Sequence, residues 1–207
     1  MYECKYPHLF APLRIGDTLF RNRIFASPTG TQYTTSLSRP FDSTMCYYER
    51  KAMGGSASVC IGDAIVDSKM GLAIGNHIRL DDPKARATLC KLSEMITRHG
   101  AVASMEMSHG GSHACLAADN GETIYGPDDL SFVKNGVTYH AHAMTREVMD
   151  LVTKKFADAA AFAKRCGFGM VTLHGGHGWM LHQFMSPTTN HRTDEYGGSF
   201  EHNMRVP

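Results

Sequence analysis

The sequence predicts an α/β fold with a parallel sheet, of which the chain supplies about the first four β–α units of a TIM-type (β/α)8 barrel. Short apolar runs alternate with amphipathic helical segments, which is typical of right-handed β-α-β units. Segments rich in glycine and histidine follow the apolar runs rather than precede them. A complete eightfold barrel takes about 250 residues. Because this chain has 207 residues and includes a long excursion, we expect residues 1–207 to form the N-terminal half of a barrel.

Four apolar runs have the length of buried strands. Parallel strands that are covered on both faces appear as short, nearly continuous apolar runs bounded by turn residues. The four runs are "RIFASP" at 23–28, "ASVCIG" at 57–62, "AVASMEM" at 101–107 and "GMVTLH" at 169–174.

The clearest helix is expected to begin after Thr145. Thr145 is a typical N-cap residue, Glu147 lies in the first turn and Gly167 supplies a stop. The expected apolar face consists of Val148, Leu151, Val152, Phe156, Ala159, Ala160 and Ala163.

Two shorter helices are expected between the first three strands. One covers residues 41–53 and ends at a pair of glycines. The other opens at Asp82-Pro83 and ends at Gly100. Its apolar face is expected to contain Leu89, Leu92 and Ile96.

The segments after the four strands predict one functional rim. They contain "SPTG", "GDAIV", "SHGGSH" and "HGGHGW", in chain order. Ligands of parallel α/β folds bind at the carboxyl ends of the strands, so these segments are expected to meet at one site. Residues 112–144, with several glycines and polar spacers, are expected to form a long excursion after the third strand.

Composition favours a small-molecule partner. Lys and Arg number 21 against 20 Asp and Glu, so no strong basic field exists to attract nucleic acid or an anionic membrane. No apolar stretch approaches the length of a membrane span, and the polar start lacks the plan of a signal peptide. We therefore expect a cytoplasmic protein. The six cysteines are spread singly, which favours reduced thiols, with Cys60 and Cys166 in the core.

Three blocks of sequence resemble the old yellow enzyme family. These are "YPHLFAPLRIGDTLFRNRIFASPTG" near the start, "SHGG" after the third strand and "HGGHGWMLHQFMSPTTNHRTDEYGGSFE" near the end. The similarity is greatest to the branch of 2-enoate, dienoyl-CoA and bile-acid-type ene-reductases. It covers the whole chain in order.

The resemblance implies an FMN-dependent oxidoreductase that uses NADH or NADPH to reduce the activated C=C bond of an α,β-unsaturated carbonyl compound. An iron–sulfur cluster and FAD, where relatives of this branch have them, are implied only for a region beyond the four units. His174 and His177 match the paired positions that bind the substrate carbonyl. Two imidazole N–H groups suit that task, because negative charge grows on the carbonyl oxygen during hydride transfer.

The resemblance also implies a flavin-binding edge. The backbone of Pro28 and Thr29, and that of Gly62 or Asp63, would line the flavin face. Glu106 stands where the family usually has a glutamine that faces the flavin pyrimidine edge. Gly30 stands where a Thr or Cys often bonds the flavin oxygen. An ionised Glu106 would repel an anionic reduced flavin, and Gly30 has no side chain to donate. Together they predict a more strongly reducing flavin.

The substrate side carries a further departure from the family. Trp179 stands where many relatives have a tyrosine that protonates the substrate, and an indole is no useful acid near neutral pH. The proton then comes from water or from another tyrosine, such as Tyr33 or Tyr139. His109, which ends the third strand, is expected either to contact the bound ligand or to satisfy backbone groups by packing.

Two other functions and an assembly of two copies are also compatible with the sequence. Histidines at strand ends also bind Zn²⁺, so a TIM-barrel metallohydrolase is the second reading, although the first expects no metal. A catalytically incompetent partial barrel is another. Half a barrel leaves two open sheet edges, which favours pairing with a second copy of the chain.

Overall fold

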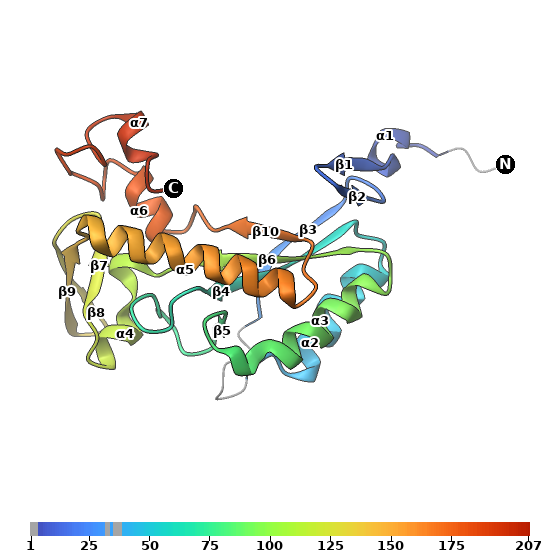
Figure 1. The fold of residues 1–207 in the computed structure, drawn as a ribbon, viewed down its shortest axis with the longest axis horizontal. Coiled ribbons are helices and arrows are strands. Elements are labelled where there is room, and N and C mark those ends of the chain that lie inside the picture. The colour runs from blue at the N-terminus through green and yellow to red at the C-terminus, as the bar shows by residue number, and fades with distance from the viewer. Residues whose placement is uncertain (1–3, 32–33, 35–38) are drawn as a thin grey trace.

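The computed structural model describes residues 4–31, 34 and 39–207. Four parallel strands in the order β10-β6-β4-β3 form the main sheet, and the short β5 pairs with β4 beyond this path (Figure 1). The strands of this sheet are β3 (Phe25–Gly30), β4 (Ser58–Ile65), β5 (Ile78–Arg79), β6 (Val102–Ser108) and β10 (Met170–Leu173). All four predicted strands are therefore present and parallel.

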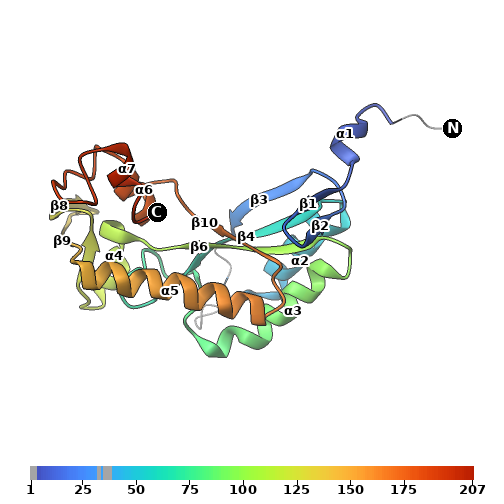
Figure 2. The same ribbon diagram turned by 45° about the horizontal axis from the view of Figure 1, so that its top comes forward.

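Three long helices cover one face of this sheet, as Figure 2 shows. They are α2 (Asp42–Met53), α3 (Arg86–Thr97) and α5 (Arg146–Arg165). A single core joins them to the outward side chains of the strands, among them Val59, Ile61, Ala103, Met105 and Met107. Leu89, Leu92 and Ile96 of α3 are fully buried in this core, as predicted.

The expected helix boundaries are confirmed with two differences. Thr145 caps α5 by accepting a hydrogen bond from the Val148 N–H. The segment after Asp82 begins as a 3-10 turn, η1 (Pro83–Ala85), and α3 ends at Thr97, before Gly100. Leu151 was expected on the buried face of α5 but is 44% exposed. The helix packs on a narrower stripe than the composition suggests, and that stripe contains Met149, Val152, Ala159, Phe162 and Ala163.

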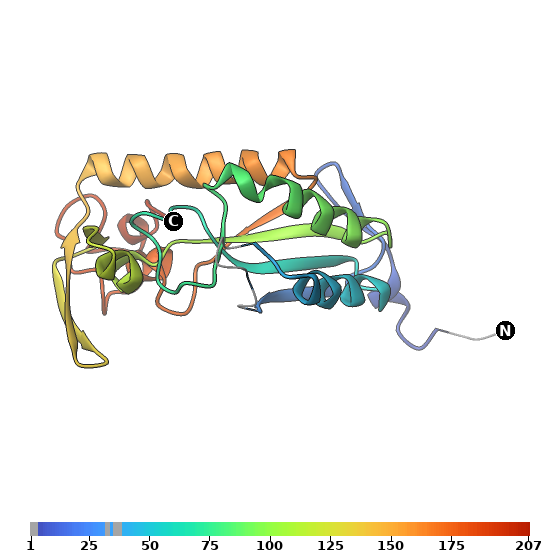
Figure 3. The same ribbon diagram turned by 90° about the horizontal axis from the view of Figure 1, so that it is seen from below.

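The excursion after β6 is folded rather than irregular. A three-stranded sheet in the order β7-β9-β8 lies at the carboxyl end of the main sheet, and the N-terminal hairpin lies at the opposite end (Figures 1 and 3). Its elements are η2 (Gly111–His113), α4 (Cys115–Asp119), β7 (Ile124–Gly126), β8 (Leu130–Lys134) and β9 (Val137–Ala143).

The remaining elements lie near the two ends of the chain. They are α1 (Pro7–Phe10), β1 (Leu13–Ile15), β2 (Thr18–Phe20), α6 (Met180–Met185) and α7 (Phe200–Asn203). The sequence did not predict the hairpin that β1 and β2 form before the first strand of the main sheet.

Candidate functional site

Two irregularities in the sheet shape the rim at its carboxyl end. The register of β3 against β4 shifts between Ala26 and Thr29, and that of β4 against β6 shifts between Ile61 and Ala64. Such bulges redirect side chains and are common beside active sites. Pro28, one of the expected flavin-edge residues, lies in the first shift and has no N–H to lose from the ladder. "SPTG" is therefore part of β3 rather than a turn after it.

Strand periodicity places polar side chains on the inner face of the sheet. Met105 and Met107 of β6 pack outward into the helical core, so Ser104 and Glu106 point the other way. On β10, Thr172 pairs in register with Glu106, and the Ser104 and Thr172 hydroxyl oxygens lie 3.5 Å apart. His174 follows two residues after Thr172 and lies on the same face.

The two predicted histidines meet each other and Glu106. The Glu106 Oε1 lies 3.4 Å from the His174 Nδ1, and the His174 Nε2 lies 3.2 Å from the His177 Nδ1. Burial, with a contribution from the Asp63 charge, raises the pKa of Glu106 to about 7. Burial also lowers the pKa of His174. Both shifts favour the uncharged forms of this pair.

The turn that carries the second imidazole is strained. His177 has a φ of 56°, in the left-handed region that few residues with a Cβ adopt. The next residue, Gly178, is also left-handed, and its N–H donates to the His182 Nδ1 over 2.9 Å. The strain holds an exposed imidazole against His174, which is typical of a position kept for function.

Gly62 is closely packed against Glu106, Pro28 and Thr29 at the centre of the rim, and this contact region is called the Gly62 cradle below. A Cβ at this position would lie 2.8 Å from the Glu106 Oε2, 2.9 Å from the Pro28 Cβ and 3.0 Å from the Thr29 nitrogen. No side chain fits there without displacing these neighbours. The cradle therefore brings the backbone of β3 and β4 and one Glu106 oxygen to the same small region.

The β3 side of the cradle is fixed from below by α2. The Tyr48 hydroxyl donates to the Thr29 carbonyl and, over 3.4 Å, to the Gly62 carbonyl. The Lys51 ammonium donates to the Thr29 hydroxyl over 3.2 Å. Gly30 pairs in register with Gly62, and a Cβ at Gly30 would lie 3.4 Å from the Asp63 nitrogen. Pro28, Thr29, Gly30, Gly62, Asp63 and Glu106 are thus brought together, as the sequence predicted.

Asp63 has a partner that sequence reasoning missed. Its Oδ1 lies 3.1 Å from the Nε2 of His77, a residue only 4% exposed that comes just before β5. The Ser108 hydroxyl donates to the same carboxylate oxygen over 3.4 Å. The His77 ring also meets the Trp179 ring edge-on, with centroids 6.3 Å apart. A single histidine between Asn76 and Ile78 gives no pattern from which this contact could have been found.

The other predicted substrate residues lie in different places. Trp179 is half-buried and is the N-cap residue of α6. His109, in contrast, lies in the interior at 2% exposure, and its Nδ1 accepts the Gly111 N–H over 3.0 Å. This is the packing role that the sequence left as the alternative. Tyr33 lies outside the described residues, and Tyr139 belongs to β9, where its hydroxyl donates to Asp119.

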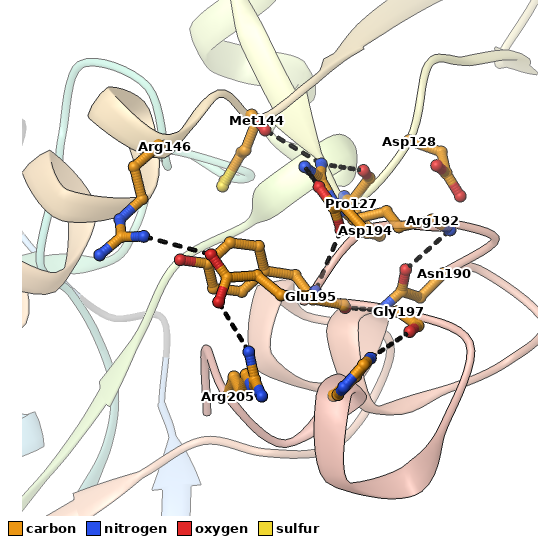
Figure 4. A network of polar contacts seen from close by, with 12 residues as sticks. Pro127, Asp128, Met144, Arg146, Asn190, Arg192, Asp194, Glu195, Gly197 and Arg205 are labelled. Atoms are coloured by element: carbon orange, nitrogen blue, oxygen red, sulfur yellow. Dashed lines mark hydrogen bonds and ion pairs between the residues drawn. The ribbon is translucent and has the colours of Figure 1, made fainter.

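The segment that follows α6 holds the rim in place through a polar network, shown in Figure 4. Arg192 donates to the carbonyls of Pro127, over 2.8 Å, and Met144, over 3.0 Å, which flank the β8–β9 hairpin of the excursion. Glu195 pairs with Arg205 over 2.7 Å and with Arg146 over 3.4 Å. The charged stretch 189–198 is therefore structural, and it ties the excursion to α5 and α7.

The donor set does not favour metal binding. Among residues 4–31, 34 and 39–207, no three His, Cys, Asp or Glu side chains are grouped so that they could hold a metal ion. The metallohydrolase reading needs such a group. In the same described part of the chain, no helix is long and apolar enough to cross a membrane.

Curated relatives identify the type of protein. The profile of the NADH:flavin oxidoreductase / NADH oxidase family matches residues 8–207. The chain is 34% identical over 202 residues to the NADH oxidase of Thermoanaerobacter brockii, covering 98% of this chain and 31% of that protein. It is 31% identical to the NADPH dehydrogenase of Bacillus velezensis, covering 95% and 56%. The chain thus spans about half, or less, of the length of these relatives.

Solved structures agree on the fold. The old yellow enzyme of Pichia sp. AKU4542 superposes with a TM-score of 0.86 at 28% identity, over 96% of this chain and 54% of that one. Histamine dehydrogenase from Rhizobium sp. 4-9 superposes with a TM-score of 0.88 at 26% identity, over 99% and 31%. The four β–α units described here correspond to part of the barrel in these proteins. The chain therefore belongs to the NADH:flavin oxidoreductase / NADH oxidase family.

Proposed function

We propose that this chain is the first half of an FMN-dependent oxidoreductase that reduces activated C=C bonds of α,β-unsaturated carbonyl compounds with NADH or NADPH. Membership of the family supports the flavin and the nicotinamide reductant. The observation that carries the proposal is the pair of imidazoles of His174 and His177, held in contact beside the Gly62 cradle. The arrangement places two imidazoles beside the strand ends at which the flavin would bind.

The edge of an isoalloxazine would lie against the β3 side of the cradle. Pro28 and Gly30 are exposed there, and the register shift at Pro28 leaves this part of β3 irregular. Thr29 is held by Tyr48 and Lys51, so the backbone is fixed before a ligand arrives. The Glu106 Oε2 faces Gly62, where it can accept from a ring N–H.

His174 and His177 would bind the substrate carbonyl oxygen as a unit: the His177 Nε2 would donate to it, and His174 would hold the His177 ring through its contact with the His177 Nδ1. When bound, the reduced flavin supplies a hydride to the carbon beta to that carbonyl. Negative charge then develops on the oxygen, and a fixed imidazole donor stabilises it without reorganising. Each well-placed donor commonly contributes about 3 kcal/mol in the transition state. Trp179, which packs against His77, would form a wall of the substrate pocket.

Glu106 would set the reducing power of the flavin. As a carboxylate it repels an anionic reduced ring, whereas as a carboxylic acid it does not. Because burial raises the pKa of Glu106 to about 7, we expect the repulsion to act above neutral pH and to fade below it. Glu106→Gln should therefore raise the midpoint potential above pH 7. An unchanged potential in a titration of the two proteins would contradict this role.

Binding of FMN tests the proposed function. FMN is titrated into the protein, and quenching of its fluorescence gives the dissociation constant. We expect Gly62→Ala to weaken binding severely, because its Cβ meets three neighbours at 3.0 Å or less. Gly75→Ala is the matched control, since its Cβ meets only Leu116, at 3.6 Å. Equal affinity in both variants, or zinc in place of flavin by elemental analysis of the protein, would overturn the proposal.

A further inference from the structure

Glu106, His174 and His177 lie in line from the interior of the sheet to its surface. Glu106 is 8% exposed on β6, His174 is half-buried after β10, and His177 is exposed in the following turn. The two successive approaches are 3.4 Å and 3.2 Å. The longer one is an ion-pair distance between the Glu106 Oε1 and the His174 Nδ1, and such contacts often tighten when a ligand binds.

The protonation state of Glu106 sets the direction of the hydrogen bonds that join Glu106, His174 and His177. A neutral imidazole has one N–H and one acceptor nitrogen. When Glu106 is ionised, it accepts from the His174 Nδ1, the His174 Nε2 accepts from the His177 Nδ1, and the His177 Nε2 is left as an acceptor. When Glu106 is protonated, each hydrogen bond changes direction: Glu106 donates to the His174 Nδ1, and the His174 Nε2 donates to the His177 Nδ1. The His177 Nε2 then carries an N–H that faces outward.

We propose that Glu106, His174 and His177 form a proton relay that protonates the substrate. The proposal rests on the proposed function, because the acceptor is the enolate formed when hydride adds to an unsaturated carbonyl compound. The His177 Nε2–H bond breaks, and its proton goes to the enolate. The His177 Nδ1 takes a proton from the His174 Nε2, and the His174 Nδ1 takes one from the Glu106 carboxyl. Glu106 is left as a carboxylate, which solvent protonates again.

The surroundings favour a proton on Glu106 rather than an ion pair. Asp63 and Cys60 of β4, and His174 just after β10, face Glu106, and Asp63 itself faces His77. Burial and the Asp63 charge both raise the pKa of Glu106. Burial lowers the pKa of His174, which opposes a permanent imidazolium beside it. Near neutral pH the favoured state therefore has an uncharged Glu106 beside uncharged imidazoles, whose hydrogen bonds can change direction.

The relay also supplies the proton that the enolate needs, for which Trp179 and Tyr139 are poor donors. Trp179 has an indole, which is not an acid at neutral pH. Tyr139 already donates to Asp119, and burial raises its pKa. Within the described part of the chain, His177 combines an exposed ring with a path to a group that titrates near pH 7.

Histidine tautomers test the relay without any cofactor. Two-bond ¹H–¹⁵N correlations of the labelled protein report which nitrogen of each ring is protonated. As the pH rises through about 7, we expect His174 and His177 to change tautomer together. In Glu106→Gln this joint change should disappear, whereas Glu94→Gln, on the exposed face of α3, should behave as the parent protein.

Two results would overturn the relay. One is that both rings keep a single tautomer across neutral pH in the parent protein. The other is that Glu106→Gln shows the same joint change as the parent. These results differ from a failure of the proposed function, which would appear as absent FMN binding with the tautomer coupling intact. In the flavin-loaded protein, the rate of enone reduction should fall above about pH 7, and Glu106→Gln should give a lower, flat profile.

Discussion

Asp63 of β4 lies near Glu106 of β6, and burial together with the Asp63 charge raises the pKa of Glu106 to about 7. The ordinary value is 4.5, so the folded protein holds a proton on Glu106 at a pH where the unfolded chain has lost it. Stability from this proton is complete below pH 4.5 and is lost as the pH rises through 7.

Glu106→Gln should therefore be more stable than the parent above pH 7. The amide has a similar shape and cannot ionise, so it avoids the cost of a buried charge. We expect a gain of about 1 kcal/mol, or about 2–4 °C in Tm for a chain of this size. Thermal unfolding at pH 5 and pH 8 measures it, with Glu94→Gln as the exposed control. A gain of equal size at both pH values would contradict the assigned cause.

His177→Gly should stabilise the fold while it removes function. Glycine adopts the φ of 56° found here without the steric cost that a Cβ carries in this region. The expected gain is about 1 kcal/mol in the free energy of unfolding. Enone reduction should fall by about 10²-fold or more. Denaturant unfolding and steady-state assays check the two halves, and a loss of stability would show that the turn is not strained.

The buried His109 should make the free energy of unfolding depend on pH in the acidic range. Burial lowers its pKa from 6.5 to about 4, so between these values the unfolded chain binds a proton that the folded protein does not. Stability should fall as the pH decreases from 6.5 towards 4, by at most about 1.4 kcal/mol per pH unit. The variant His109→Gln should show a shallower slope in Tm against pH. The exposed His140→Gln should retain the parent slope, and a change in its slope would argue for a general effect of charge.

Thr145→Ala should destabilise α5 by about 1 kcal/mol, because the Val148 N–H loses its side-chain acceptor. Thr145→Ser retains a hydroxyl at the N-cap and should restore most of the loss. Helical content and Tm by circular dichroism provide the comparison. If serine and alanine were equally destabilising, packing of the threonine methyl group would be the cause instead of capping.

The sequence predicted the elements whose patterns are long and regular. The four strands and the helices at 42–53, 86–97 and 146–165 follow from apolar spacing, caps and glycines. The strands at 13–15, 18–20 and 124–143 are short or polar, and tertiary contacts rather than local pattern decide them. Leu151 shows the same limit within a helix, because α5 has more apolar residues than the core buries, and the sequence alone does not tell which of them stays exposed.

The site was predictable where residues follow strand ends. Glu106 and His174 come together because strand alternation and the pairing of β6 with β10 place them there, and the turn after β10 brings His177 to His174. The Asp63–His77 contact joins β4 to the segment before β5, and no local pattern encodes such a pairing. His109 belongs to the same rim by sequence, yet a Cβ at Gly71 would lie 2.6 Å from its ring, so close packing keeps it in the interior.

Re-oxidation of the reduced flavin tests the central claim most directly. The protein loaded with FMN is reduced with NADPH in the absence of oxygen and mixed with an α,β-unsaturated ketone, while the flavin absorbance is followed. The parent should re-oxidise in step with loss of the alkene. The double variant with alanine at positions 174 and 177 should be slower by about 10²-fold or more. Re-oxidation of that variant at the parental rate would show that the paired imidazoles do not bind the substrate carbonyl.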